Sequence, residues 1–300
     1  MNPDPLDPPL LPRHAEPGTS GVLTPPYLWR PRPKYQDRVW LHVLLFVLTV
    51  GSTWWVDGLA YSATILGILG CHELGHYFAC RYYDVDASLP YFLPIPITLT
   101  GTLGAFIRIR EPIPTKRMLF DIGIAGPIAG FLVAVPALFA GVAWSRVTPI
   151  GHEEGLWLGE PLLVKLASRL FWGPMPDGYT LLLHPVGFAA WFGLLATALN
   201  LFPIGQLDGG HISYAVLGRR STYVTVAMIG VTLGLSYLSA SWVVWTVLMI
   251  GMLFTFGPRH PRTIDEDVPL DRTRLVLAVF AVAMFALCFT PAPIEQLINR

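Results

Sequence analysis

Long apolar runs, separated by short polar connections, make up most of the sequence after residue 38. A helix crosses the hydrocarbon core of a bilayer with about 20 mostly apolar residues, and about seven runs come close to that length. The fifth and sixth runs are short and meet near residue 240, which predicts a helical hairpin. The pattern therefore predicts an all-α multi-pass membrane protein with about seven transmembrane helices, at about 39–56, 58–80, 119–143, 184–204, 222–239, 241–257 and 273–290.

The first 38 residues have a different composition. They are rich in proline and show no basic start followed by an apolar run, which argues against a signal peptide. Proline-rich stretches without an apolar pattern do not build a packed core. We therefore expect a disordered Pro-rich tail over residues 1–38 and a membrane domain over residues 39–300.

Basic residues gather at alternate ends of the predicted spans. Cytoplasmic connections of membrane proteins carry an excess of Lys and Arg, and the second, fourth and sixth spans all lead into basic residues. We therefore expect the N-terminal tail in the cytoplasm and the C-terminus outside, with the mixed-charge connection 144–183 also outside. The basic residues are Arg30, Arg32, Lys34 and Arg38, then Arg81, Arg108, Arg110, Lys116, Arg117, Arg219, Arg220, Arg259 and Arg262.

Composition agrees with a membrane protein. The chain is 53% hydrophobic and 13% charged, whereas soluble domains are about 25% charged. Lys+Arg and Asp+Glu balance at 20 each, so net charge favours neither a nucleic acid nor an acidic partner. The three cysteines lie in or beside apolar runs, which indicates packing residues rather than a disulfide framework.

The second predicted span contains the most informative residues, His72-Glu73-Leu74-Gly75-His76. On a helix, the two histidines lie about one turn apart on one face, and Glu73 falls within the same arc. H-E-x-x-H is the pattern with which zinc hydrolases bind metal through two imidazoles and activate water with a carboxylate. Ionisable residues inside a membrane are costly, which favours a functional role. A hydrogen-bonded polar patch or proton relay is the alternative.

A catalytic zinc usually has three protein ligands, so a third ligand is expected in another span. Asp208 follows the fourth apolar run and precedes Arg219. It therefore lies near the cytoplasmic end of its span, at the same depth as the two histidines. Pro203 and Gly205 break the helix just before it, and irregular backbone at membrane depth is tolerated where it lines a cavity. A helix cap or interfacial charge is the alternative for Asp208.

Two motifs together, His72-Glu73-Leu74-Gly75-His76 and Asn200-x-x-Pro203-x-x-x-Leu207-Asp208-Gly209, resemble those of the site-2 protease family of intramembrane zinc metalloproteases. The resemblance covers about residues 58–218, including segments 101–108 and 125–130, and implies a catalytic core of three spans. The connection 144–183 is too short for the PDZ domain found in one branch of that family. The chain thus resembles a minimal form without a PDZ domain.

The resemblance implies roles for five residues. His72, His76 and Asp208 match the ligands of Zn²⁺. Glu73 matches the general base, and Asn200 matches a polar residue near the substrate or the developing oxyanion. The implied function is an intramembrane zinc metalloendopeptidase that cleaves transmembrane or membrane-proximal segments of membrane proteins in regulated intramembrane proteolysis. Its partners would be these substrates and the lipid bilayer, and the expected location is a bacterial plasma membrane, with an organelle membrane as the alternative.

Two further segments bear on substrate access and packing. Residues 89–97 are apolar but too rich in proline for a helix, and residues 98–110 have strand-like character. We expect a membrane-associated loop leading into a β-hairpin, whose edge could hold an unwound substrate; a purely structural loop is the alternative. Gly126 and Gly130 favour close helix packing, with close substrate approach as the alternative. Asp121 is expected to be an interfacial charge, with support of the site as the alternative.

Two other classes of function compete with proteolysis. A transporter or ion channel could use Glu73, His72, His76 and Asp208 as a cation path, but the chain has no recognisable internal repeat. An inactive zinc-binding scaffold would not need Glu73, which is present.

Overall fold

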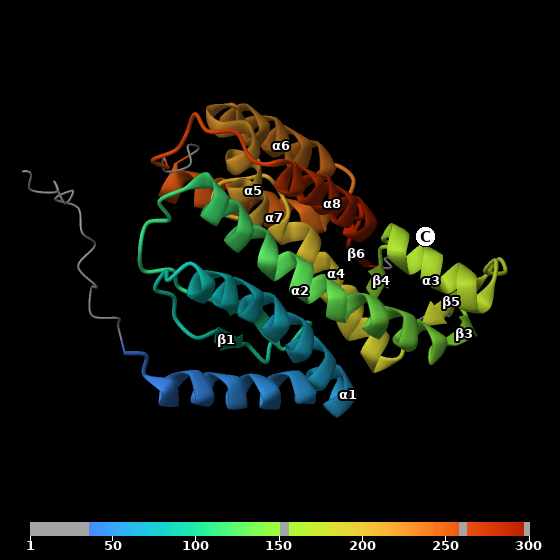
Figure 1. Cartoon of the computed structure of the whole chain (residues 1–300). Coiled ribbons are helices and arrows are strands. Elements are labelled where there is room, and N and C mark those ends of the chain that lie inside the picture. The colour runs from blue at the N-terminus through green and yellow to red at the C-terminus, as the bar shows by residue number, and fades with distance from the viewer. Residues whose placement is uncertain (1–35, 151–155, 258–262, 297–300) are drawn as a thin grey trace, which may run out of the picture. The chain divides into compact units, whose positions relative to one another are not determined.

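The computed structural model describes residues 36–150, 156–257 and 263–296 (Figure 1). All of the expected tail except residues 36–38 lies outside these described residues. Within them, helices dominate and short strands join them, so the expectation of a mostly helical protein is confirmed.

Each of the seven apolar runs contains a helix. By length and hydropathy, α1 and α2 are able to cross a membrane; crossings by the other apolar helices stay a prediction. The helices that match the runs are α1 (Val39–Tyr82), α2 (Lys116–Ala143), α4 (Pro185–Asn200), α6 (Ser221–Leu235), α7 (Ala240–Phe256) and α8 (Arg272–Cys288).

Helix α1 accounts for two of the predicted spans because it bends between them. The backbone leaves helical geometry at Asp57 and Gly58, and Gly58 has a φ of 79°, which residues with a side chain rarely adopt. The bend divides α1 into an N-terminal segment, residues 39–56, and a C-terminal segment, residues 59–82. Only the C-terminal segment contains the H-E-x-x-H residues.

Local signals fix where two of the helices begin. The hydroxyl of Thr115 accepts the Met118 amide at 3.3 Å and caps α2. Helix α4 has a proline in its first turn and the ring of His184 as its cap, which accepts the Val186 amide at 3.3 Å. Both helices therefore start where the sequence offers a cap.

Several described elements were not expected from the sequence. The sequence predicted one β-hairpin in an otherwise helical protein, and the described residues contain two more two-stranded sheets. The additional helices are α3 (Leu162–Trp172), α5 (Asp208–Leu217) and the short 3-10 helix η1 (Gly218–Arg220). The strands are β1 (Tyr91–Pro94), β2 (Thr102–Phe106), β3 (Arg146–Pro149), β4 (Leu156–Leu158), β5 (Tyr179–Leu182) and β6 (Ile294–Gln296), paired as β1–β2, β3–β5 and β4–β6.

The β1–β2 pair is the expected hairpin, but its first strand lies in the segment that we expected to be a loop. Tyr91 pairs with Phe106, and the register shifts before Pro94 pairs with Thr102. A proline lacks the amide needed for a ladder and is tolerated at a strand end or an irregularity. The prolines of residues 89–97 therefore shorten β1 without abolishing it.

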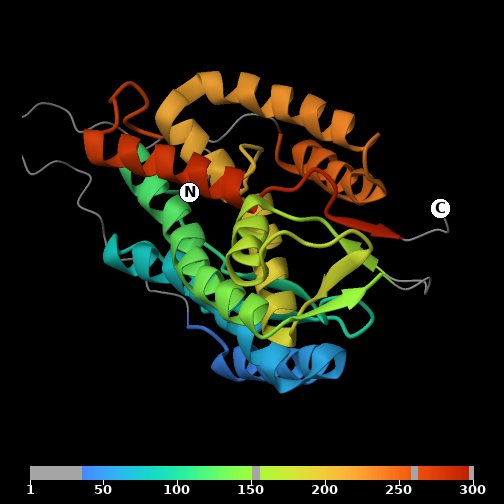
Figure 2. The ribbon, with the colours of Figure 1, turned by 90° about the vertical axis from the view of Figure 1, so that its right-hand side faces the viewer.

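The core forms where α1, α2 and α4 pack together (Figure 2). Small residues allow the close approach. A Cβ added to Gly141 would lie 2.1 Å from the amide nitrogen of Gly187, and one added to Gly75 would lie 2.5 Å from the carbonyl oxygen of Ala125. Side chains at these positions would force α2 away from α4 and α1, which are the helices that carry the candidate site.

Candidate metal centre

Three side chains of the candidate site come from the C-terminal segment of α1. Glu73 follows His72 by one position on the helix, and His76 follows His72 by four. The exposed fractions of His72, Glu73 and His76 are 6%, 7% and 7%. Such burial of two imidazoles and a carboxyl is costly unless other groups satisfy them. Their partners come from α2, the β-hairpin and the region after α4.

Asp208 reaches the histidines through a tight reversal of the chain. Helix α4 ends at Asn200, and Gly205 turns the backbone with a φ of 54°. Asp208 then starts α5. A Cβ added to Gly209 would lie 2.0 Å from the carbonyl oxygen of Leu201, so the residue after Asp208 has to be small. The Pro/Gly helix break expected from the sequence is this reversal.

The ligand-type atoms of His72, His76 and Asp208 converge. The two Nε2 atoms lie 3.2 Å apart. The Asp208 oxygens lie 3.2 Å from Nε2 of His72 and 3.3 Å from Nε2 of His76. In the described part of the chain, this is the group of three such residues that could hold a metal ion.

These separations fit zinc. A tetrahedral centre with bonds of about 2.0–2.1 Å separates its ligand atoms by about 3.3 Å. The tautomer of His76 also fits, because its Nδ1 lies 2.7 Å from the carbonyl oxygen of Ile122. A carbonyl can only accept, so Nδ1 carries the proton and Nε2 presents a lone pair to the cluster. A cation between the ligand atoms is therefore what this donor set can hold.

Two glycines of α2 provide the space for the imidazole rings. A Cβ added to Gly126 would lie 2.1 Å from Nε2 of His76, and one added to Gly130 would lie 3.1 Å from Cβ of His72. The predicted close packing of this glycine pair is present between α1 and α2, and the groups that fill the space are the two histidines.

Glu73 has a backbone partner from the β-hairpin. Its carboxylate accepts a hydrogen bond from the backbone amide of Ile107, directly after β2. Neither this amide nor the carbonyl of Ile122 was foreseen from the sequence. Main-chain groups carry no side-chain signature, so only the fold could reveal them.

Asn200, at the end of α4, also reaches the cluster. Its Nδ2 lies 3.2 Å from Nε2 of His72. All five residues predicted from the sequence are thus within one site, and no other described residue had been assigned to it.

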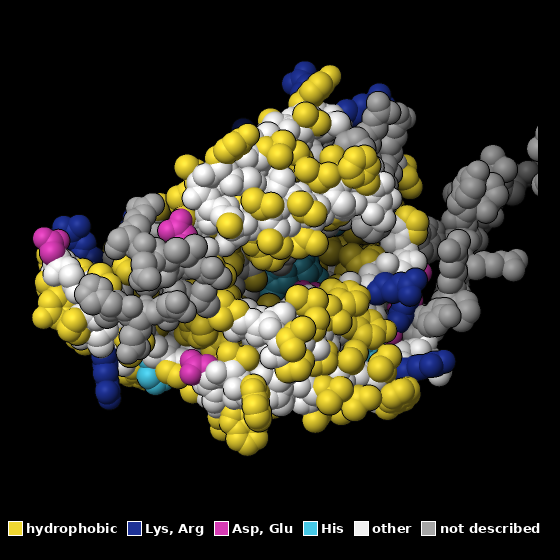
Figure 3. Space-filling view, turned by 180° about the vertical axis from the view of Figure 1, so that it is seen from behind, with side chains coloured by type: hydrophobic (Ala, Val, Ile, Leu, Met, Phe, Trp, Pro, Cys, Tyr) yellow, Lys and Arg dark blue, Asp and Glu magenta, His cyan; other side chains and the backbone are white. Residues whose placement is uncertain are grey.

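A cavity of about 240 Å³ opens onto these residues. Besides the cluster, its walls include Phe106 and Ile107 of the hairpin region, Leu119 of α2, and Gln206 and His211 near Asp208. Figure 3 shows the hollow, with hydrophobic side chains around its rim and histidine and acidic side chains at its base. Gln206 and His211 line the cavity although neither is among the five residues predicted for the site.

Asp121 lies next to the residue that fixes His76. It pairs with Arg274 of α8 and accepts a hydrogen bond from the Tyr83 hydroxyl just after α1. Burial, followed by the Asp121 carboxylate, raises the pKa of Tyr83. Asp121 therefore joins α1, α2 and α8 beside Ile122, which is the supporting alternative rather than a plain interfacial charge.

Known proteins match most of the chain. The sequence profile of Peptidase family M50 matches residues 60–241. "Probable zinc metalloprotease EGY2, chloroplastic" of Arabidopsis thaliana is 30% identical over 246 residues, which are 79% of this chain and 42% of that protein. "Probable zinc metalloprotease EGY1, chloroplastic" of the same plant is 33% identical over 67% of this chain and 34% of that protein.

The rice protein "Probable zinc metalloprotease EGY3, chloroplastic" is 30% identical over 74% of this chain and 41% of its own length. The chain thus spans between about a third and two fifths of the length of these relatives. They are named as chloroplastic, so they lend no support to the bacterial plasma membrane as the location. The described residues of the 144–183 connection form α3 and the short strands β3, β4 and β5.

Proposed function

The chain belongs to peptidase family M50, the site-2 protease family, and we propose that it is an intramembrane zinc metalloendopeptidase acting on transmembrane or membrane-proximal segments of membrane proteins. The observation that carries the proposal is the convergence of ligand atoms from three residues, 3.2–3.3 Å apart, beside a buried glutamate. No nucleic acid enters the proposal, and the partners are membrane-protein substrates and lipid.

His72, His76 and Asp208 would hold Zn²⁺. When bound, zinc would polarise the scissile carbonyl and make a water more acidic. The chain's part is to aim the three ligand atoms at one point. Ile122 keeps the His76 lone pair on that side, and Gly126 leaves the ring its room.

Glu73 would move the proton. It takes a proton from the attacking water and delivers it to the leaving amine, a role worth about 10²–10⁴-fold in rate. The backbone amide of Ile107 restrains its carboxylate, so the base is held beside the ligand atoms. Asn200 would donate its amide N–H to the oxygen that gains charge, where one such donor contributes about 10²–10³-fold.

The substrate would lie along the β-hairpin. A peptide bond in a helix is shielded by its own turn, so the substrate has to be extended before cleavage. In the described residues, β2 pairs with β1 alone, and its end forms a wall of the cavity at Phe106. Adding an extended substrate to the open edge of this sheet would bring it next to Glu73.

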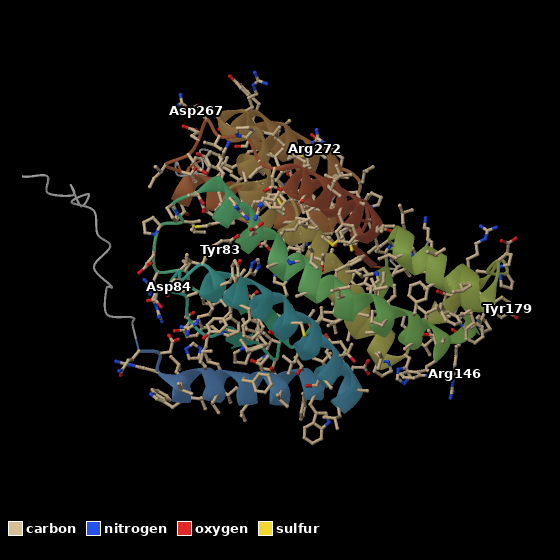
Figure 4. The ribbon with its side chains drawn as sticks, in the orientation of Figure 1. Tyr83, Asp84, Arg146, Tyr179, Asp267 and Arg272 are labelled. Carbon is tan, nitrogen blue, oxygen red and sulfur yellow. The ribbon has the colours of Figure 1, made fainter. Side chains whose placement is uncertain are left out.

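We also propose seven spans with the N-terminus on the cytoplasmic side. Tyr83, Asp84, Asp267 and Arg272 lie at one end of the helices, and Arg146 and Tyr179 lie at the other (Figure 4). Exposed Trp and Tyr side chains mark membrane interfaces. They occur at the expected cytoplasmic ends (Trp40, Tyr82 and Tyr223) and at the expected external ends (Trp54, Trp55, Trp144 and Tyr237).

The source membrane is proposed from the sequence resemblance alone. The bacterial plasma membrane stays our proposal, and the chloroplastic relatives make an organelle membrane the alternative. Cleavage would release a membrane-tethered protein, as regulated intramembrane proteolysis requires.

The test uses purified full-length protein, a model transmembrane substrate and a zinc assay. Glu73→Gln should keep the metal and lose about 10²–10⁴-fold in cleavage, whereas Asp208→Ala should lose the metal. Glu111→Gln, the same change at a residue outside the cavity wall, is the control and should cleave normally. Equal cleavage by wild type and Glu73→Gln would refute the mechanism, and metal flux in liposomes without cleavage would support a transporter.

A further inference from the structure

Helix α3 presents three distinct faces. Leu163, Val164 and Ala167 are buried. On the outer side, Leu162, Leu166 and Leu170 recur every four residues and are 54%, 57% and 66% exposed. Lys165 and Arg169 are exposed beside these leucines. At 100° per residue, the leucines cover one outer arc of the helix and the two basic residues the adjacent arc.

The C-terminal end of α3 is fixed at the C-terminal end of α2. The indole of Trp172 donates to the carbonyl oxygen of Val142 at 2.9 Å, and Phe171 packs edge-on against Phe139. Exposed Trp144 lies beside it, just beyond α2. This end is the expected external boundary of the membrane.

The N-terminal end of α3 is fixed at a deeper level. Gly159, three residues before the helix, accepts a hydrogen bond from the indole of Trp191 at 2.7 Å. Trp191 lies six residues into α4, about 9 Å along its axis. The start of α4 is level with the end of α2, because His184 packs against Trp144. Helix α3 therefore slants, with Leu162 deeper than Leu170.

An apolar ridge flanked by basic residues is the pattern of a helix in a membrane interface. Exposed apolar residues also occur on α2 and α8, against which α3 packs, at Leu132 of α2 and at Val279 and Val282 of α8. The stems of Lys and Arg can lie along lipid while their charged ends reach phosphate groups. Both observations favour lipid over a soluble partner.

We propose that α3 is a slanted interfacial helix of the external leaflet, with Leu162, Leu166 and Leu170 against acyl chains and Lys165 and Arg169 at the phosphates of the lipid headgroups. The proposal rests on the membrane placement in the proposed function. It assigns the 144–183 connection a lipid-binding surface in addition to its contacts with α2, α4 and α8.

The test is a depth measurement on full-length protein in liposomes of phosphatidylethanolamine and phosphatidylglycerol. Spin labels are placed at Leu162→Cys, Leu166→Cys, Leu170→Cys and Lys165→Cys after replacement of Cys71, Cys80 and Cys288. At each position, the accessibility of the spin label to oxygen is compared with its accessibility to a water-soluble nickel chelate. We expect greater access to oxygen, which indicates lipid, at the three leucine positions, and a depth in the membrane that decreases from residue 162 to residue 170. The label at 165 should be more accessible to nickel than all three.

Val47→Cys, on the exposed face of the N-terminal segment of α1, separates the two proposals. An aqueous label at 47 would overturn the membrane placement itself. Lipid at 47 together with water at 162, 166 and 170 would overturn only the interfacial helix. Spin–spin broadening at the leucine positions would also overturn it, in favour of a second copy of the chain.

If the cysteine-free background does not fold, a photoreactive benzophenone residue at Leu166 or Lys165 serves with the native cysteines in place. Crosslinking to lipid at 166 well above that at 165 would support the proposal. Equal or absent lipid adducts at both would contradict it.

Discussion

The two segments of α1 differ in how they join the molecule. The C-terminal segment, residues 59–82, packs directly on α2 and carries His72, Glu73 and His76. The N-terminal segment, residues 39–56, exposes large apolar residues such as Val43, Val47 and Trp55. Its polar side chains hold the β-hairpin: Ser52 donates to the carbonyl oxygen of Gly101 at 2.7 Å.

The base of the hairpin is also tied to the N-terminal segment. Nδ1 of His42 lies 3.1 Å from the carbonyl oxygen of Pro90, and the ring contacts Tyr91, which stacks on Phe106 in the cavity wall. The bent element α1 thus supplies the chemical groups from its C-terminal segment and positions the substrate-side hairpin with its N-terminal segment. Changes in the C-terminal segment's contacts should affect metal binding, and changes in the N-terminal segment's contacts should affect substrate binding.

The largest effect is expected for Gly126→Ala. The new Cβ would overlap the ring of His76, 2.1 Å from its Nε2, so the imidazole has to leave the cluster. Mutation of a residue that supports a metal ligand typically costs about 10–100-fold in metal affinity or activity. We expect the loss in Gly126→Ala to reach the upper end of this range, because the ligand itself is displaced. Zinc content and cleavage should fall together. Gly67→Ala, on α1 with open space around it, is the matched control, and normal zinc in Gly126→Ala would contradict the packing argument.

The second effect is expected for Ile107→Pro, which removes the amide that Glu73 accepts. A hydrogen bond to a charged group contributes about 1.5–3 kcal/mol, so kcat should fall about 10–100-fold while zinc content stays normal. Ile107→Val keeps the amide and should retain activity. A loss of zinc in the proline variant would mean that the hairpin supports the metal ligands and not the base.

From the sequence, the chemical groups of the C-terminal segment could be predicted, but most of the surrounding contacts could not. His72, Glu73 and His76 share a face because helix geometry fixes their spacing, and the depth of Asp208 followed from its distance to basic residues. The amide of Ile107 and the carbonyl of Ile122 could not be predicted, because every residue type except proline offers the same backbone groups.

The expected helices were found for a similar reason, since long apolar runs are strong signals. Helix α3 was missed because its 11 residues lie in a connection of mixed charge. Strand β1 was missed because prolines dominate its segment. The spacing of Gly126 and Gly130 predicted a close approach, but only the structure identified the histidine rings that fill it.

A smaller effect is expected for Ser52→Ala in the N-terminal segment. The change removes the buried hydrogen bond to the hairpin turn, worth about 0.5–1.5 kcal/mol. KM for a transmembrane substrate should rise about 2–10-fold, with kcat and zinc content near those of wild type. Thr64→Ala, which loses only an exposed hydrogen bond to Ala60 in its own helix, is the control. A fall in kcat without a change in KM would place the hairpin's effect in the chemical step.

The smallest effect is expected at the joint between the two segments. Oγ1 of Thr53 and Oγ of Ser62 lie 2.7 Å apart across the bend, and both residues are buried. Hydrogen bonds between helices in membranes average about 0.6 kcal/mol, so a cycle of Thr53→Val, Ser62→Ala and the double variant should show a coupling of about that size in unfolding free energy. Cleavage should change less than about twofold, because neither side chain reaches the cavity wall. A coupling near zero would mean that the bend of α1 is held by its backbone at Gly58 and by the hairpin. The two segments would then be joined through the substrate-binding element rather than directly, and substrate binding could alter the bend without disturbing the metal ligands.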